Sequence, residues 1–167
     1  VALAGYAVSH DGKYLAYGLA ASGSDWNEWK VRDIATGKDL DDHLKWVKFS
    51  GAAWTKDSAG FFYSRYDEPN EKTKLEDANY FQKLYYHRLG TAQSADVLIL
   101  NKADRLSELD RPALEALAMD LAPRAARQWA TFGDIGEDAL RALLAAPAPL
   151  RAHCGCGHDH HEHDHSL

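Results

Sequence analysis

The chain has 167 residues and a formal net charge of −6, with 46% apolar and 26% charged residues, which predicts a globular protein of one domain or two small ones. The acidic balance gives no electrostatic support for nucleic-acid binding. No apolar run approaches the roughly 20 residues of a membrane span, and the first residues lack the pattern of a signal peptide, so we expect a cytoplasmic protein without membrane contact.

An internal repeat organises the first part of the chain. Residues 9–17, SHDGKYLAY, align with residues 55–63, TKDSAGFFY, 46 positions later. Each copy is a polar turn followed by a short aromatic and aliphatic strand, and Asp-Gly and Asp-Ser suit tight turns. Further strands are predicted at residues 5–9, 28–34 and 83–89, and a surface loop at residues 68–74. A period in the mid-forties is typical of β-propeller blades; the alternative is an unrelated meander with a chance repeat.

Four stretches make this pattern more specific: GYAVS at 5–9, YGLAASGSDW at 17–26, VKFSGAAWT at 47–55 and KLYYHRLGT at 83–91. They resemble the β-propeller of the prolyl oligopeptidases, over residues 1–95. The resemblance implies a cytosolic serine peptidase that cleaves short peptides after proline, with a propeller that covers an α/β-hydrolase domain. It also places Phe49 at the position of a phenylalanine that lines the peptide pocket. Without a hydrolase domain we expect Phe49 to pack at a sheet edge instead.

Peptidase chemistry is not expected from these 167 residues. A serine nucleophile needs a strand-to-helix elbow with a His and an Asp nearby, and no Gly-x-Ser-x-Gly occurs in the sequence. Gly23-Ser24-Asp25 is predicted to be a turn. Two blades also cannot close a ring, which typically needs four to eight. The open sheet edges therefore predict self-association.

The composition changes at Asp96. Nine Lys and three Arg precede it, whereas one Lys and six Arg follow it, and all eight Tyr lie before it. A β domain joined to an α domain would explain the aromatic residues, which favour strands. It would not explain the switch from Lys to Arg, which indicates two sources for the chain.

Residues 97–100, VLIL, predict a strand buried on both faces of a parallel sheet. Asn101-Lys102-Ala103-Asp104 follows at its carboxyl end, where α/β sheets bind ligands. The Asp104 carboxylate can accept hydrogen bonds from N1–H and N2–H₂ of guanine, which adenine does not offer. The Lys102 stem can cover the purine face, and Asn101 can tie the base-binding loops together.

Two helices and one strand are predicted after this loop. The first helix has Ser107 as its N-cap, Pro112 in its first turn and Pro123 at its end. Its apolar stripe consists of Leu109, Leu114, Leu117, Ala118 and Leu121. A strand is predicted within residues 126–132. The second helix, residues 137–145, is stopped by Pro147 and Pro149.

Residues 96–106, DVLILNKADRL, residues 121–125, LAPRA, and the Cys/His-rich tail resemble the CobW-like metallochaperone GTPases. The resemblance spans residues 96–167 and implies a GTP-dependent zinc or cobalt chaperone in which Asn101, Lys102 and Asp104 recognise guanine. The family's P-loop, G-x-x-x-x-G-K-[ST], and its Cys-x-Cys-Cys motif do not occur in the sequence. Nothing would then cradle the phosphates or hold Mg²⁺, so we expect negligible GTP binding.

The tail, residues 151–167, carries six of the nine histidines and both cysteines. The candidate metal ligands are His153, Cys154, Cys156, His158, His160, His161, His163 and His165. Imidazole and thiolate suit Zn²⁺ and other transition metals, and the irregular spacing predicts a disordered, multidentate scavenger. An expression tag and a solvated acidic tail are the alternatives. The two cysteines are too close together to staple a fold, which favours a reducing compartment.

The sequence thus predicts a mixed fold in three parts: an incomplete all-β propeller over residues 1–95, a partial α/β GTPase domain over residues 96–150, and the tail. The join lies near residues 93–98, where the two resemblances share a short string. A recombinant gene, a deliberate fusion and an assembly error would each produce such a chain, and Val1 in place of Met is typical of a fragment or a processed form.

Three alternative functions are compatible with this predicted organisation. The first is a fragment without enzymatic activity, whose remaining competence is metal binding by the tail. The second is a metallochaperone relic that still binds guanine nucleotides. The third is a propeller module that docks on a separate peptidase domain.

Overall fold

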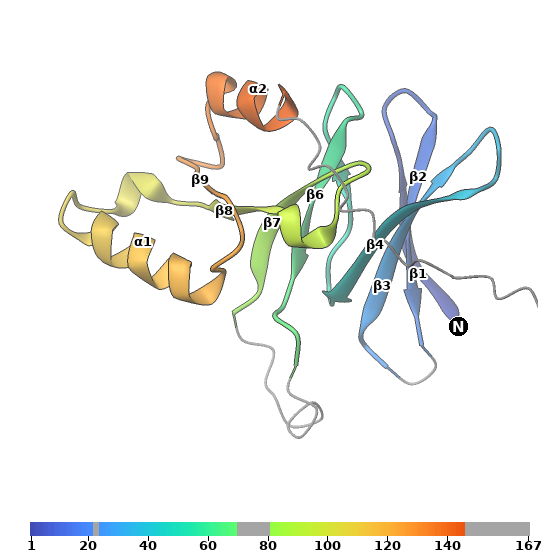
Figure 1. The fold of residues 1–167 in the computed structure, drawn as a ribbon, viewed down its shortest axis with the longest axis horizontal. Helices are drawn as coiled ribbons and strands as arrows, with labels where there is room; N and C mark the ends of the chain where they lie inside the picture. Colours follow the sequence, from blue (N-terminus) through green and yellow to red (C-terminus); the bar gives the residue numbers. More distant parts are fainter. Residues whose placement is uncertain (22–23, 70–80, 146–167) are drawn as a thin grey trace, which may run out of the picture.

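The computed structural model describes residues 1–21, 24–69 and 81–145, and within them two β-sheets lie side by side (Figure 1). The first sheet has four antiparallel strands in the order in which they occur along the chain. These strands are β1 (Ala2–Val8), β2 (Tyr14–Ala20), β3 (Asn27–Asp33) and β4 (Asp39–Val47). This consecutive meander is the arrangement of one propeller blade.

The second sheet has five strands, again in sequence order. These are β5 (Ala53–Trp54), β6 (Gly60–Arg65), β7 (Lys83–Arg88), β8 (Val97–Leu100) and β9 (Arg127–Trp129). Neighbouring strands are antiparallel as far as β8, and β9 adds to β8 in parallel. The remaining elements are the 3-10 helices η1 (Gln93–Ala95) and η2 (Ala103–Arg105), and the helices α1 (Asp110–Leu121) and α2 (Glu137–Ala145).

The predicted repeat is a repeat of hydrogen bonds as well as of sequence. The Ser9 hydroxyl donates to Asp11 Oδ1 at 2.7 Å, and the Thr55 hydroxyl donates to Asp57 Oδ1 at 2.6 Å. The same carboxylate oxygens accept the backbone N–H groups of Lys13 and Ala59, each at 3.1 Å. Each aspartate therefore closes the turn that leads into the second strand of its sheet.

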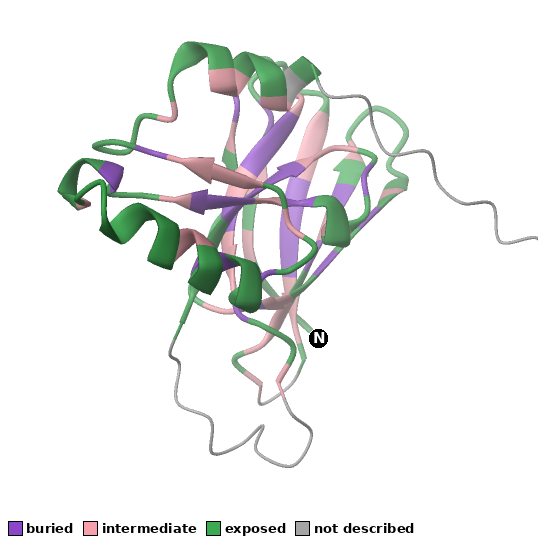
Figure 2. Cartoon of the chain, turned by 60° about the vertical axis from the view of Figure 1, so that its left-hand side comes forward, coloured by how far each residue is buried: buried purple, intermediate pink, exposed green. Residues whose placement is uncertain are grey.

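The main core lies between the two sheets. Trp29 and Val31 from β3 and Leu44 from β4 face Phe61 from β6 and Tyr85 from β7, and each is no more than 3% exposed. Sheet-on-sheet packing of alternate residues is the expected way to bury one face of each meander. Figure 2 shows the buried residues concentrated where the sheets meet, while the helices are largely exposed.

The strand β8 differs in part from its prediction. Both of its faces are covered, because Leu98 belongs to the core between the sheets and Ile99 to a second cluster with Tyr86 and Ala130. However, it lies in a mixed sheet rather than a parallel one, since its other neighbour, β7, runs antiparallel to it. The strand thus completes the second blade and begins a strand-helix-strand unit at the same time.

The first helix starts later than predicted. Leu109 lies just before α1 and is 89% exposed, so the expectation that it belongs to the apolar stripe was wrong. Ser107 is not the N-cap of the observed helix, but its hydroxyl accepts the backbone N–H of Asp110 at 3.2 Å and closes the preceding turn. Pro112 falls in the first turn of α1, as predicted. The second helix has the predicted bounds, and the two prolines expected to stop it lie outside the described residues.

Strands β4 and β5 were not among the predicted strands. β4 alternates partly between charged and apolar residues. Asp42 lies in the interior with 1% exposure, and a charged residue at a buried position hides the alternating pattern of this strand. β1 forms one edge of the first sheet and exposes Leu3, Tyr6 and Val8 at 61%, 68% and 49%. Within the described ranges, no helix is long and apolar enough to cross a membrane.

Candidate functional site

The loop that follows β8 meets the loop that follows β9. Because the two strands are parallel, their carboxyl ends lie at the same edge of the sheet. The Asn101 side-chain oxygen Oδ1 accepts the backbone N–H of Gly133 at 3.1 Å and that of Lys102 at 2.7 Å. The Asp104 carboxylate accepts the backbone N–H of Phe132 at 3.3 Å. Asn101 and Asp104 thus join the two loops.

The chemistry of this loop pair is limited by its contacts. Asn101, Lys102 and Asp104 are all exposed, and Lys102 adopts a left-handed backbone conformation with φ of 63°. One Asp104 oxygen already accepts the Phe132 N–H, so in a bidentate contact with guanine that oxygen would accept two hydrogen bonds. Guanine recognition by this loop therefore stays a prediction from the sequence, and no glycine-rich phosphate loop occurs in the printed sequence.

Phe49 lies in the segment between β4 and β5. Its side chain is 72% exposed and its φ is 50°, a conformation that bulky residues rarely adopt. The expectation that Phe49 packs at the edge of a sheet was therefore wrong. An exposed ring on a strained backbone is available for contact with another surface.

Two other predicted sites are the turn at Ser24 and the metal ligands of the tail. The Ser24 hydroxyl accepts the backbone N–H of Trp26 at 3.1 Å, and the Ser24 N–H donates to the Ala21 carbonyl at 3.0 Å, which is a turn rather than an activated nucleophile. All eight metal-ligand candidates of the tail lie outside the described residues. Residues 1–21, 24–69 and 81–145 contain no group of three or more His, Cys, Asp or Glu side chains that could hold a metal ion.

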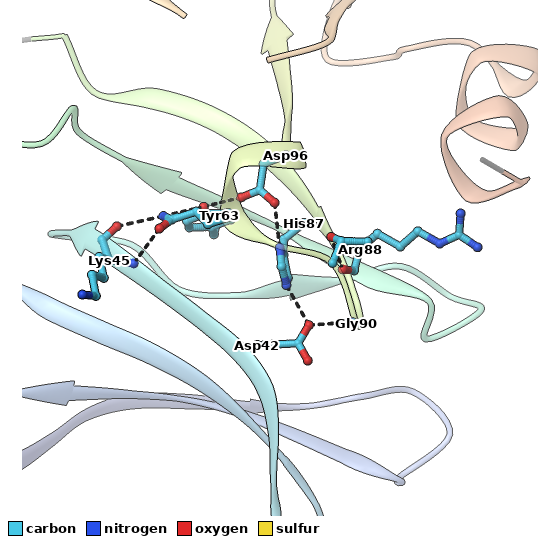
Figure 3. A network of polar contacts seen from close by, with 9 residues as sticks. Asp42, Lys45, Tyr63, His87, Arg88, Gly90 and Asp96 are labelled. Carbon is cyan, nitrogen blue, oxygen red and sulfur yellow. Dashed lines mark hydrogen bonds and ion pairs between the residues drawn. The ribbon is translucent and has the colours of Figure 1, made fainter. Parts of the chain in front are cut away.

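A buried polar network links the two sheets (Figure 3). His87 on β7 contacts Asp96 Oδ1 through Nδ1 at 2.7 Å and Asp42 Oδ1 through Nε2 at 3.0 Å. The Tyr63 hydroxyl donates to the other Asp96 oxygen at 2.5 Å, and the Gly90 N–H donates to Asp42 at 2.7 Å. None of the four side chains is more than 3% exposed.

The charges of this network stabilise the imidazolium form of His87. Burial disfavours the charged ring, but the hydrogen bonds and negative charges of Asp42 and Asp96 outweigh it and raise the pKa of His87 from 6.5 to about 9. Burial, together with the negative charge of Asp96, also raises the pKa of Tyr63. Since the folded-state pKa of His87 exceeds its unfolded value, its contribution is complete below pH 6.5 and disappears as the pH rises through 9.

This network is structural rather than catalytic. An Asp–His pair could move a proton, but His87 is 0% exposed, so its ring has no contact with solvent. Sequence reasoning missed it because its members come from four separate elements, and a lone His on a strand carries no signal of its partners. Asp42, His87 and Asp96 together join the first sheet to the second and to the segment that leads into β8.

These features define a class of protein: two consecutive propeller blades, locked together by a buried charge network, with no catalytic constellation among the described residues. The profile of the family described as prolyl oligopeptidase, N-terminal beta-propeller domain, matches residues 1–109. The chain belongs to this family.

Several prolyl endopeptidases are similar to the chain. The prolyl endopeptidase of Elizabethkingia meningoseptica is 45% identical over 98 residues, which are 59% of this chain and 14% of that protein. Prolyl oligopeptidase A of Amanita bisporigera is 43% identical over 113 residues, covering 56% of this chain and 14% of its relative. The chain therefore spans about one seventh of the length of these relatives.

Solved structures agree with these matches. One is from a structural and mechanistic analysis of two prolyl endopeptidases, with 47% identity and a TM-score of 0.52 over 58% of this chain and 13% of that structure. Another is prolyl oligopeptidase B of Galerina marginata bound to a 35mer hydrolysis and macrocyclization substrate, with 31% identity, a TM-score of 0.52, and coverage of 58% of this chain and 15% of that one. The blades are thus of the prolyl oligopeptidase type.

Proposed function

We propose that this chain is a non-catalytic module of a proline-specific serine peptidase, whose two blades belong to the propeller that restricts access to a peptidase domain. The observation that carries the proposal is the match of residues 1–109 to the propeller domain. The similarity to prolyl endopeptidases suggests short proline-containing peptides as the substrate class. Within the described residues, Ser24 closes a turn and His87 is buried, so neither is placed to act as a nucleophile or a base.

The test of this proposal is cleavage of a chromogenic proline-containing peptide. We expect no hydrolysis by the chain alone, and a change in cleavage when the chain is added to a separately produced peptidase domain. The exposed Phe49 offers a matched pair, since Phe49→Ala should weaken the effect of the chain while Phe132→Ala, a similarly exposed ring in the other segment, should not. Hydrolysis by the chain alone, or a peptidase domain indifferent to it, would contradict the proposal.

We infer that residues 96–150, of which 96–109 also fall within the propeller match, derive from a CobW-like GTPase and no longer bind GTP usefully. The unit β8, α1 and β9 with two parallel strands is compatible with such an origin, as is the bond between Asn101 and Gly133. Phosphate contacts normally come from a glycine-rich loop that ends in a Lys. This G-x-x-x-x-G-K-[ST] motif does not occur in the sequence. Titration with Mg²⁺-GDP should therefore give no micromolar binding, and tight binding would refute this inference.

We further propose that the tail captures Zn²⁺ or a related transition metal. Eight His and Cys side chains within residues 151–167 offer soft and borderline ligands. In a Zn²⁺ titration with a competing chromophore, we expect a chain that ends at residue 150 to lose high-affinity binding. Binding by the full chain should weaken as the pH falls through about 6.5, because imidazole ligands become protonated.

The matched control for the tail replaces the two exposed histidines of the first sheet and its turn, His10 and His43, by Gln. This variant should keep the Zn²⁺ affinity of the parent chain. Equal affinity of the full and shortened chains would place the metal elsewhere and overturn the proposal.

A further inference from the structure

A cavity of about 620 Å³ lies beneath α1, between this helix and the strands β7 and β8. Its size falls in the range of roughly 300–1,000 Å³ that is usual for small-molecule sites. The wall is mostly apolar, and both α1 and the strands contribute residues to it. Its main apolar residues are Leu84, Leu98, Leu100, Leu114, Leu117 and Leu121.

The cavity exists because α1 packs loosely. Ala118 is the only buried residue of this helix, while Leu117 and Leu121 on the cavity side remain 50% and 39% exposed. Leu84 on β7 is likewise 37% exposed. These leucines leave apolar surface in contact with water, and a ligand with an apolar body would remove that surface from water.

The charges around the cavity have a single sign. Lys83, Lys102 and Arg105 line it, and no Asp or Glu of the described residues does, although the whole chain has a net charge of −6. Lys83 is already paired with Asp67 and donates to the Leu121 carbonyl at 3.0 Å. Lys102 and Arg105 make no ion pair within the described ranges.

The free cations lie at one end of the apolar wall. Lys102 and Arg105 belong to the loop that follows β8, near the start of α1, whereas Lys83 contacts the last residue of that helix. A ligand would therefore place an anionic head beside the β8 loop and extend its apolar part along α1. Charge-assisted contacts of Lys and Arg favour a carboxylate head.

We propose that this cavity binds an amphipathic monoanion of the fatty-acid class. An apolar chain of roughly ten carbons would lie along the ~18 Å length of a twelve-residue helix. The site shares Lys102 with the predicted guanine-reading loop, but it uses none of Phe49, Asp104 or the tail, and the inferred loss of useful GTP binding leaves Lys102 available.

Calorimetric titration of the full chain with decanoate, below its micelle concentration, tests the proposal. We expect saturable binding of one decanoate per chain and no such binding of decyltrimethylammonium, which has the same tail and the opposite charge. Absence of decanoate binding would overturn the proposal, and equal binding of both ligands would overturn the role of the cations.

Two matched pairs of variants locate the site. Leu117→Asp should weaken decanoate binding roughly tenfold or more, because it places a charge in the apolar wall, whereas Met119→Asp should leave it unchanged. Both side chains are half exposed on α1, at 50% and 52%, so neither change threatens the core. Equal effects of the two would refute the location.

The second pair tests the anionic end. Arg105→Gln should weaken decanoate binding roughly fivefold or more through loss of a charged contact, while Arg141→Gln, an exposed change on α2 remote from the cavity lining, should not. Equal effects of these two variants would show that general charge rather than the proposed site attracts the ligand.

Discussion

Replacement of His87 by leucine is expected to lower the free energy of unfolding by about 3–5 kcal/mol. The change removes the shared partner of Asp42 and Asp96 and leaves two carboxylates in the interior, each no more than 1% exposed. Asp42 is the more vulnerable, because its second oxygen already has no hydrogen-bond partner within the described part of the chain. Urea denaturation monitored by tryptophan fluorescence measures the loss.

The control for this prediction is His43→Leu. His43 bonds to Glu28 on the exposed face of the first sheet, with side chains 40% and 54% exposed, so we expect a change within about 0.5 kcal/mol. Similar losses for the two variants would mean that the buried network does not stabilise the fold.

The pH dependence of stability distinguishes a charged His87 from a merely well-packed one. Because the pKa of His87 rises from 6.5 to about 9 on folding, the parent chain should lose about 3 kcal/mol between pH 6 and pH 9.5. The leucine variant should lack this slope. A parent chain with equal stability at both pH values would refute the raised pKa.

Replacement of Gly60 by alanine is expected to cost about 3 kcal/mol, because it overpacks the start of β6 against β7. A Cβ atom at this position would lie 2.2 Å from the His87 carbonyl oxygen and 2.7 Å from the Tyr86 hydroxyl. The carbonyl belongs to the backbone of β7, so relief of the clash would require β6 and β7 to separate. Urea denaturation at pH 7 measures the cost.

Gly51 provides the matched control, since a Cβ atom there would meet nothing within 4 Å and its backbone conformation is not left-handed. Gly51→Ala should change stability by no more than about 0.5 kcal/mol, and a slight gain is consistent with reduced freedom of the unfolded chain. A Gly60→Ala variant as stable as Gly51→Ala would show that the two strands do not approach as closely as described.

The repeat was predictable from sequence because its cause is local. Asp11 and Asp57 each close a turn by accepting from residues two positions away on either side. Alternating aromatic and aliphatic residues then predict the strand that follows. The same holds for α2, whose periodicity gave the observed bounds.

Other outcomes depended on neighbours distant in sequence. The apolar run at Val97–Leu100 predicts a strand in a parallel sheet. In the structure, β7 of the second blade pairs with this strand in the antiparallel direction. Leu109 follows the period of α1 but precedes its first turn. The short β5 carries too few residues for any pattern to form.

The local sequence was sufficient to predict the blade type, the turns and the helix in the last described segment, because each depends on contacts within a few positions. The tertiary structure, by contrast, was needed to bring Asp42, Tyr63, His87 and Asp96 together. It also decided that α1 stands over an open cavity lined by cations. Both result from packing between distant segments, and burial of a charge or failure to fill a space has no counterpart in local sequence pattern.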